Sequence, residues 1–164
     1  MADGTRRTTF NNLLTLTREY LVRGLNLPDE RVFRAIRPVV PKNIGFQADL
    51  YLVLRPGGAR VEGEWADSEG RLATAVNREL IVEPYIRLAQ DTVSSNDKLA
   101  QVLLGYEDDI VNLLQIFEPT DSLEPFHWLG VAAEETQQTA SPGWAWDSMR
   151  FSVKFLQAVD QKLQ

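Results

Sequence analysis

The residue types that carry out nucleophilic or metal chemistry are scarce in this chain. Its 164 residues include one histidine, His127, and no cysteine, so thiol nucleophiles, Cys/His dyads and zinc clusters are excluded by count. His127 stands between Phe126 and Trp128, where a packed core residue is expected rather than a general base. A Ser/His/Asp triad lacks the Gly-x-Ser-x-Gly turn that presents its nucleophile. We therefore expect the chain not to be an enzyme.

Clustered carboxylates and glycines are the other groups with chemical potential. The acids gather at Glu62/Glu64, Glu107-Asp108-Asp109 and Glu134-Glu135, and such groups can bind Mg²⁺ or act as acid and base. Adjacent acids on a helix point away from one another, so a solvated face is the favoured interpretation. Gly57-Gly58 matches neither glycine-rich phosphate motif, which favours a tight turn after a strand. No cofactor and no metal are expected.

Tryptophan is the residue type that most favours a contact with another protein. Trp65 lies in an acidic stretch with little local core to enter, so contact with a partner and burial in the core are equally expected for it. Trp144 and Trp146 share one face of a predicted strand, and packing against the sheet is favoured for both.

Charge is unevenly distributed along the sequence. Residues 1–60 hold ten Lys/Arg and five Asp/Glu, a balance of +5, whereas residues 61–164 hold seven and eighteen, a balance of −11. The net charge of −6 argues against general affinity for nucleic acid, which requires clustered basic residues. Regions of opposite sign can attract one another between subunits, although intermixing of the charges on the folded surface is the simpler expectation.

The hydrophobic pattern predicts a cysteine-free α+β domain. Apolar spacing of three and four residues predicts helices over 8–25 and 96–117, the second with a capping box formed by Ser94 and Asp97. Strands are predicted over 49–55, 76–88, 126–133 and 148–155, the last from strict alternation. Their order, α-β-β-α-β-β, predicts a mostly antiparallel sheet of about four strands with the two helices packed on one face.

Two intervening segments and one proline are less regular. Residues 31–40 contain several β-branched and aromatic residues, but Pro38 lies among them and Pro41 follows. This pattern predicts an edge strand or an extended arm. Residues 59–74 are rich in Gly and acids, which predicts a long exposed loop or a hairpin arm. Pro84 predicts an edge position or a bulge for its strand.

No apolar run approaches the roughly 18 residues that span a bilayer, so no membrane association is expected, and the start of the sequence does not resemble a secretory signal.

The order of elements resembles that of the tail-terminator (tail-completion) proteins of long-tailed bacteriophages and related phage-like particles. The resemblance rests on the opening helix, the strand pair around 49–54 and 78–82, the helix containing 103–110 and the closing alternating strand. It covers nearly the whole chain and includes no diagnostic motif. Residues 1–164 are accordingly expected to form a single tail-terminator-like domain.

The resemblance implies a structural subunit that forms a six-membered ring, caps the finished tail tube and offers the surface to which the head attaches. It implies a tail-tube protein, a head-connector protein and further copies of the chain as partners, with DNA only as passing cargo. The virion tail is the implied location, after assembly in the bacterial host cytoplasm. The segment 55–74 becomes the candidate for assembly contacts, which are Arg55, Arg60, Glu62, Glu64 and Trp65. Another head-tail joining or neck protein, and an intracellular adaptor or binding module, remain the alternatives.

Overall fold

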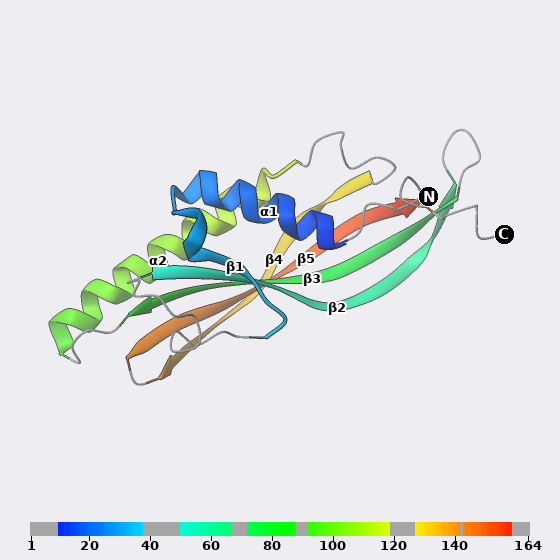
Figure 1. Cartoon of the computed structure of the whole chain (residues 1–164). Coiled ribbons are helices and arrows are strands. Elements are labelled where there is room, and N and C mark those ends of the chain that lie inside the picture. The colour runs from blue at the N-terminus through cyan, green and yellow to red at the C-terminus, as the bar shows by residue number, and fades with distance from the viewer. Residues whose placement is uncertain are drawn as a thin grey trace.

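Two helices and five strands make up the described part of the chain. The computed structural model describes residues 10–37, 50–66, 72–87, 92–118, 127–141 and 143–158. The elements are α1 Phe10–Leu25, the short 3-10 helix η2 Asp29–Arg31, β1 Val32–Arg34, β2 Leu50–Ala66, β3 Leu72–Arg87, α2 Val93–Gln115, β4 His127–Ser141 and β5 Trp144–Ala158. Figure 1 shows a long, strongly twisted sheet with both helices on one side of it.

The sheet confirms the α+β class and corrects the strand count. Its strand order is β1-β2-β3-β5-β4, and β1 pairs in parallel with Leu52–Leu54 of β2 while all other pairs are antiparallel. The expected four strands in the order α-β-β-α-β-β are therefore wrong, because a three-residue strand precedes them and makes the sheet mixed. Of the two interpretations of residues 31–40, the edge strand is correct for Val32–Arg34.

The main core lies between the helices and one face of the sheet, here called the helix-covered face. The helices contribute Phe10, Leu13, Leu14, Leu21, Ile110, Leu114 and Phe117, and the strands contribute Val32, Leu52, Leu54, Leu80, Val82, Met149, Phe151, Val153 and Phe155. Alternation along each strand turns the intervening side chains to the opposite side. That second face carries a smaller buried cluster of Tyr51, Val53 and Tyr85.

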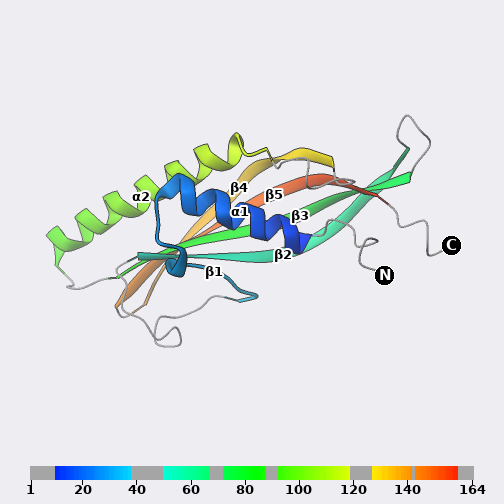
Figure 2. The same cartoon turned by 45° about the horizontal axis from the view of Figure 1, so that its top comes forward.

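A close crossing fixes α1 against α2. A Cβ atom on Gly24 would lie 2.7 Å from Cδ1 of Leu113, so the lack of a side chain lets the helices approach. The Tyr20 hydroxyl donates a hydrogen bond of 2.6 Å to the Leu113 carbonyl oxygen, and its ring packs 4.5 Å from that of Phe117. The first helix is thereby held over the end of the second (Figure 2).

The second helix starts earlier than its sequence pattern suggests. The predicted capping box of Ser94 and Asp97 is wrong, because Thr92 occupies the cap and its hydroxyl accepts a hydrogen bond of 3.1 Å from the Ser95 N–H. A threonine oxygen in this position satisfies one of the free N–H groups of the first turn. Several N-terminal candidates compete in this polar stretch, and sequence alone does not rank them.

The segment 59–74 forms a hairpin arm in its described part, which excludes the alternative of a loop. Both β2 and β3 continue through it, and their register runs from Leu50↔Ile86 to Ala66↔Leu72 with shifts after Pro56 and Val61. The sequence did not distinguish a hairpin from a loop here, because the two register shifts break the alternation on which strand prediction depends.

Pro84 lies in a central strand without a bulge, which contradicts the edge or bulge that it predicts. The pairing of β3 with β5 keeps the same register from Val82↔Met149 to Tyr85↔Trp146 and omits the two positions between. The missing proline N–H thus falls in a short gap of the β3–β5 ladder. The gap removes the conflict that proline normally causes inside a sheet.

Candidate assembly surface

Four of the five predicted contact residues lie together at one end of the sheet. Arg60, Glu62, Glu64 and Trp65 all belong to β2, opposite residues 73–77 of β3. The Arg60 guanidinium lies 3.7 Å from the Glu62 carboxylate, with side chains 75% and 35% exposed, and so exposed a pair contributes little to stability. Glu64 is exposed as well. The backbone of Trp65 pairs with Ala73, and its side chain lies outside the described part.

This end of the sheet extends past the helices. Figures 1 and 2 both show β2 and β3 running beyond α1. Val61 lies opposite Val76, which packs against the main core, so the helix-covered face continues here without a helix over it. Its apolar side chains are correspondingly open to solvent, with Val61 66% and Leu72 43% exposed. We call this uncovered region, residues 59–66 and 72–76, the arm.

Arg55 is set apart from the other four contact residues. Its guanidinium donates two hydrogen bonds, of 2.7 and 3.0 Å, to the carboxylate of Glu83 on the second face. The Glu83 side chain is fully buried and that of Arg55 is 14% exposed, and the Ser148 hydroxyl donates a further bond of 2.5 Å to Glu83. A buried, bidentate pair of this kind holds three strands in register, so the charge of Arg55 is already used within the subunit.

The polar row continues along the second face. Arg150 donates a hydrogen bond of 2.8 Å to Glu79, and the Ser152 hydroxyl donates one of 2.5 Å to the Asn77 side-chain oxygen. Glu135 lies opposite Arg150 on the edge strand β4. Positive and negative groups therefore alternate across the middle of this face and largely compensate one another.

Aromatic side chains form a second row beside the polar one. Tyr51 and Tyr85 stack with ring centres 4.6 Å apart, and Trp146 stacks on Tyr85 at 4.9 Å. Trp144 and Phe33 meet Tyr51 edge-on at 5.2 and 6.1 Å. Burial raises the pKa of the Tyr51 hydroxyl far above its usual value. The favoured packing of Trp144 and Trp146 against the sheet is confirmed, and four strands contribute to one rigid cluster.

An acid is buried under α2. Asp147 is fully buried, and neither of its carboxylate oxygens has a hydrogen-bond donor among the described residues. Its pKa is raised to about 8 by burial first and then by the facing Glu107 carboxyl. Gln138, which lies opposite Asp147 on β4, donates a long hydrogen bond of 3.4 Å to Glu107. The sequence analysis did not predict this buried acid, because the strand was predicted only from residue 148 onward and Asp147 lies just before it.

A groove lies beyond this acid, between the first half of α2 and the neighbouring strand ends. It holds a cavity of about 220 Å³. Its lining is mainly apolar and consists of Ile86, Asn96, Leu99, Ala100, Leu103, Gln138, Thr139, Ala140 and Ala145. We call it the α2–β4 groove.

Both edges of the sheet offer backbone groups to a further strand. No described strand pairs with the outer side of β4, and β1 covers β2 only at Leu52–Leu54. Most of the β4 side chains from Ala132 to Ala140 are exposed. Unpaired edges of this length are templates for contact with another chain.

No group of three or more His, Cys, Asp or Glu side chains suited to a metal ion occurs among the described residues. The backbone of His127 begins β4 opposite Leu156, and its side chain lies outside the described part. No helix in the described ranges is long and apolar enough to cross a membrane.

Comparison with known proteins gives matches among solved structures alone. No protein-family model matches the sequence, and no curated protein matches it either. One matching solved structure is a chain from "Virion of native gene transfer agent (GTA) particle", at 11% identity and a TM-score of 0.44 over 83% of this chain and 84% of that chain. A likeness at this level carries no conclusion about function. The resemblance to tail terminators stays a prediction.

Proposed function

We propose that the chain is a non-enzymatic structural subunit of a phage or phage-like tail, a tail terminator that closes the end of the tail tube as a ring. In this role several copies contact one another side by side, one rim of the ring meets the tube and the other meets the head connector. DNA passes through the ring without being recognised. The assembled subunit resides in the virion tail after assembly in the host cytoplasm.

The observation that supports this proposal is the arm. Its apolar side chains Val61 and Leu72 continue the face that elsewhere forms the main core, yet no helix covers them. Together they expose apolar area on a rigid, paired ribbon, and such area on a folded subunit marks a contact with another protein. Arg60 and Glu62 lie on the same strand, and Arg60 pairs with Asn77 of the second face, so the arm offers polar groups on one face and apolar groups on the other.

The unpaired edges of β4 and outer β2 are consistent with the same role. A ring needs two different surfaces on each subunit, because each copy contacts one neighbour through one surface and the other neighbour through the other. The two edges of the sheet, one formed by β1 with the uncovered part of β2 and the other by β4, offer such a pair of surfaces.

Removal of the apolar contact tests the proposal. The double variant Val61→Lys/Leu72→Lys places charges on two solvent-exposed sites, so folding should be unaffected. Light scattering is then used to follow the mass of purified wild type and variant with increasing concentration, alone and beside tail tubes. The proposal expects a ring of the wild type that the variant fails to form or to seat on tubes. Ile116→Lys, at an exposed apolar site just after α2 and away from the arm, is the control and should assemble normally.

A further inference from the structure

The two edges of the sheet differ in charge. Since β1 and β4 lie at opposite ends of the strand order, the elements beside them form opposite sides of the subunit. The segment at and after β1 carries exposed Arg34 and Arg37. The side formed by α2 and β4 carries the acids Asp97, Glu107, Asp108, Glu134 and Glu135. The charge asymmetry of the sequence thus becomes, in the fold, a polarity across the sheet.

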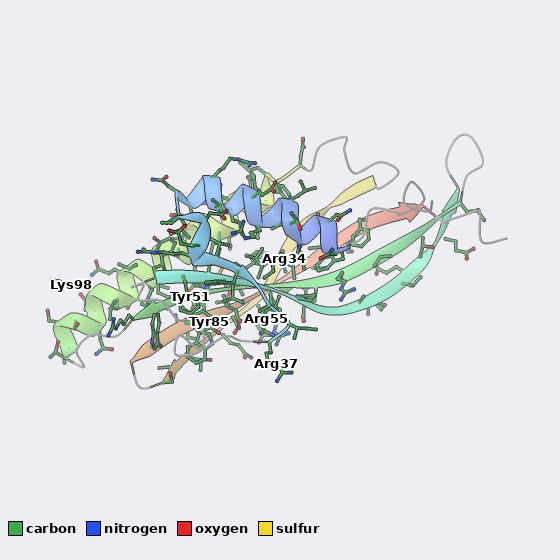
Figure 3. All side chains as sticks on the ribbon, viewed as in Figure 1. Arg34, Arg37, Tyr51, Arg55, Tyr85 and Lys98 are labelled. Atoms are coloured by element: carbon green, nitrogen blue, oxygen red, sulfur yellow. The ribbon has the colours of Figure 1, made fainter. Side chains whose placement is uncertain are left out.

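The charges on the β1 side are not neutralised within the described part. Arg34 donates hydrogen bonds to the carbonyl and side-chain oxygens of Asn11 and to the Thr15 hydroxyl, which are all neutral acceptors. Arg37 is exposed and forms no ion pair with any described residue. Figure 3 shows its side chain directed away from the sheet.

An exposed apolar residue lies between the two arginines. The Ile36 side chain is 76% exposed, beside Ala35, whose N–H pairs with the Leu54 carbonyl oxygen. The pairing fixes the start of the segment on the sheet edge. The sequence Arg34–Arg37 therefore presents an apolar side chain flanked by two positive ones.

The α2–β4 groove has the complementary character. Its walls are lined by Leu99, Ala100 and Leu103 from the helix and by mainly apolar side chains from the strands, among them Ile86, Ala140 and Ala145. Asp97 follows the lining residue Asn96 directly, and Asp108 lies eleven residues further on, three turns along the same side of the helix. Neither acid forms an ion pair with a described residue. The groove is thus an apolar cavity beside a helix flank that carries two acids without ion-pair partners among the described residues, with exposed Lys98 next to Asp97.

We infer that the Arg34–Arg37 segment of one copy docks on the α2–β4 groove of a second copy, with Ile36 in the groove and the two arginines facing Asp97 and Asp108. The inference rests on the proposed function, since it names the contact that joins neighbours in the ring. Because the two surfaces differ and lie on opposite sides, the contact is head-to-tail. Each of the two copies therefore keeps its other surface free for a further copy. Contacts of that type close into rings or continue as chains.

Charge reversal on each side tests the docking. The variant Arg34→Glu/Arg37→Glu makes both sides acidic, and Asp97→Lys/Asp108→Lys makes both sides basic. Each variant alone should associate more weakly than the wild type by a factor on the order of 100 at low salt. An equimolar mixture of the two restores opposite charges at every contact and should recover assembly, with the two variants in equal number by native mass spectrometry.

Matched variants separate docking from folding. Arg37→Glu alone leaves the hydrogen bonds of Arg34 intact and should weaken association in the same direction, as should Ile36→Ser. Arg23→Glu/Lys154→Glu reverses two exposed charges elsewhere and should associate like the wild type. Circular dichroism establishes that each variant is folded. Association of the wild type should also weaken from 50 to 500 mM salt, as screening shortens the range of the charges.

The outcomes for the docking and for the proposed function differ. A ring that forms equally well from the wild type and both reversed variants overturns the docking and leaves the function standing. Charge-dependent pairs or open chains that never close or bind tubes support the docking and overturn the function. Folded variants that fail to assemble even when mixed contradict the docking. A wild type that stays monomeric at every concentration and beside tubes overturns both.

Discussion

The substitution Asp147→Asn should stabilise the protein at neutral pH and flatten the dependence of its stability on pH. The Asp147 side chain is fully buried without a hydrogen-bond donor among the described residues. Its pKa of about 8 compares with an ordinary 3.8. The folded state therefore holds the proton more tightly than the unfolded state, and the neutral carboxyl is the form that the fold accommodates.

The sign and size of the effect follow from this difference. Below about pH 4 both states are protonated and the full stability is present. As pH rises towards 8 the unfolded state loses its proton while the folded state retains it, so the free energy of unfolding falls by up to about 1.4 kcal/mol per pH unit. At pH 7 the accumulated loss has an upper limit of about 4 kcal/mol. Relaxation of the surroundings around an ionised Asp147 lowers the folded-state pKa and so reduces this loss of stability. Asp147→Asn should therefore gain about 2–4 kcal/mol at pH 7 and little near pH 4.

Urea unfolding followed by tryptophan fluorescence from pH 4 to pH 8 measures this directly. The quantity of interest is the difference in unfolding free energy between variant and wild type, since carboxyl groups that do not interact with Asp147 cancel in it, and only the facing Glu107 does not. Asp108→Asn, at an exposed acid on the same helix, is the matched control and should leave the difference near zero throughout. An Asp147→Asn curve parallel to that of the wild type would refute the reasoning, because the buried carboxyl would then be ionised without cost.

Three further predictions concern stability and are measured by urea or thermal unfolding. Glu83→Leu alone should cost about 3–5 kcal/mol because it leaves Arg55 unpaired, whereas Arg55→Met/Glu83→Leu should cost much less; equal losses would contradict a coupled pair. Gly24→Val should cost about 1–3 kcal/mol through its clash with Leu113, while Gly105→Ala, with open space around it in α2, should gain up to about 1 kcal/mol. Thr92→Ala should cost about 1 kcal/mol through loss of the α2 cap, and an unchanged midpoint would place the cap elsewhere.

The sequence predicted the parts of the fold that depend on periodic burial. The apolar stripes of α1 and α2 and the alternation along β5 each reflect one buried face, so the helices, the last strand and the α+β class were all predictable. What escaped prediction depends on partners distant in sequence. The short strand at Val32–Arg34 exists because Leu52–Leu54 offers it an edge, and Pro84 is tolerated because the β3–β5 ladder has a gap beside it.

The candidate site divides in the same way. The resemblance in the order of elements predicted residues 55–74 as the contact region, which stays a prediction, and the structure places four of the five named residues on the arm. The sequence could not show that Arg55 is committed to Glu83, since a cross-strand ion pair 28 residues apart leaves no local pattern. Nor could it show that the arginines around Ile36 and the acids of α2 lie on opposite sides of one sheet, because that placement follows from strand order alone.

The most direct test of the central claim is electron microscopy of the purified protein mixed with tail tubes from its own particle. The account predicts a ring of this chain at one end of each tube, with a central hole, and tubes that no longer lengthen once it is bound. Tubes that remain bare and continue to grow in its presence, with the protein free in solution, would contradict the account.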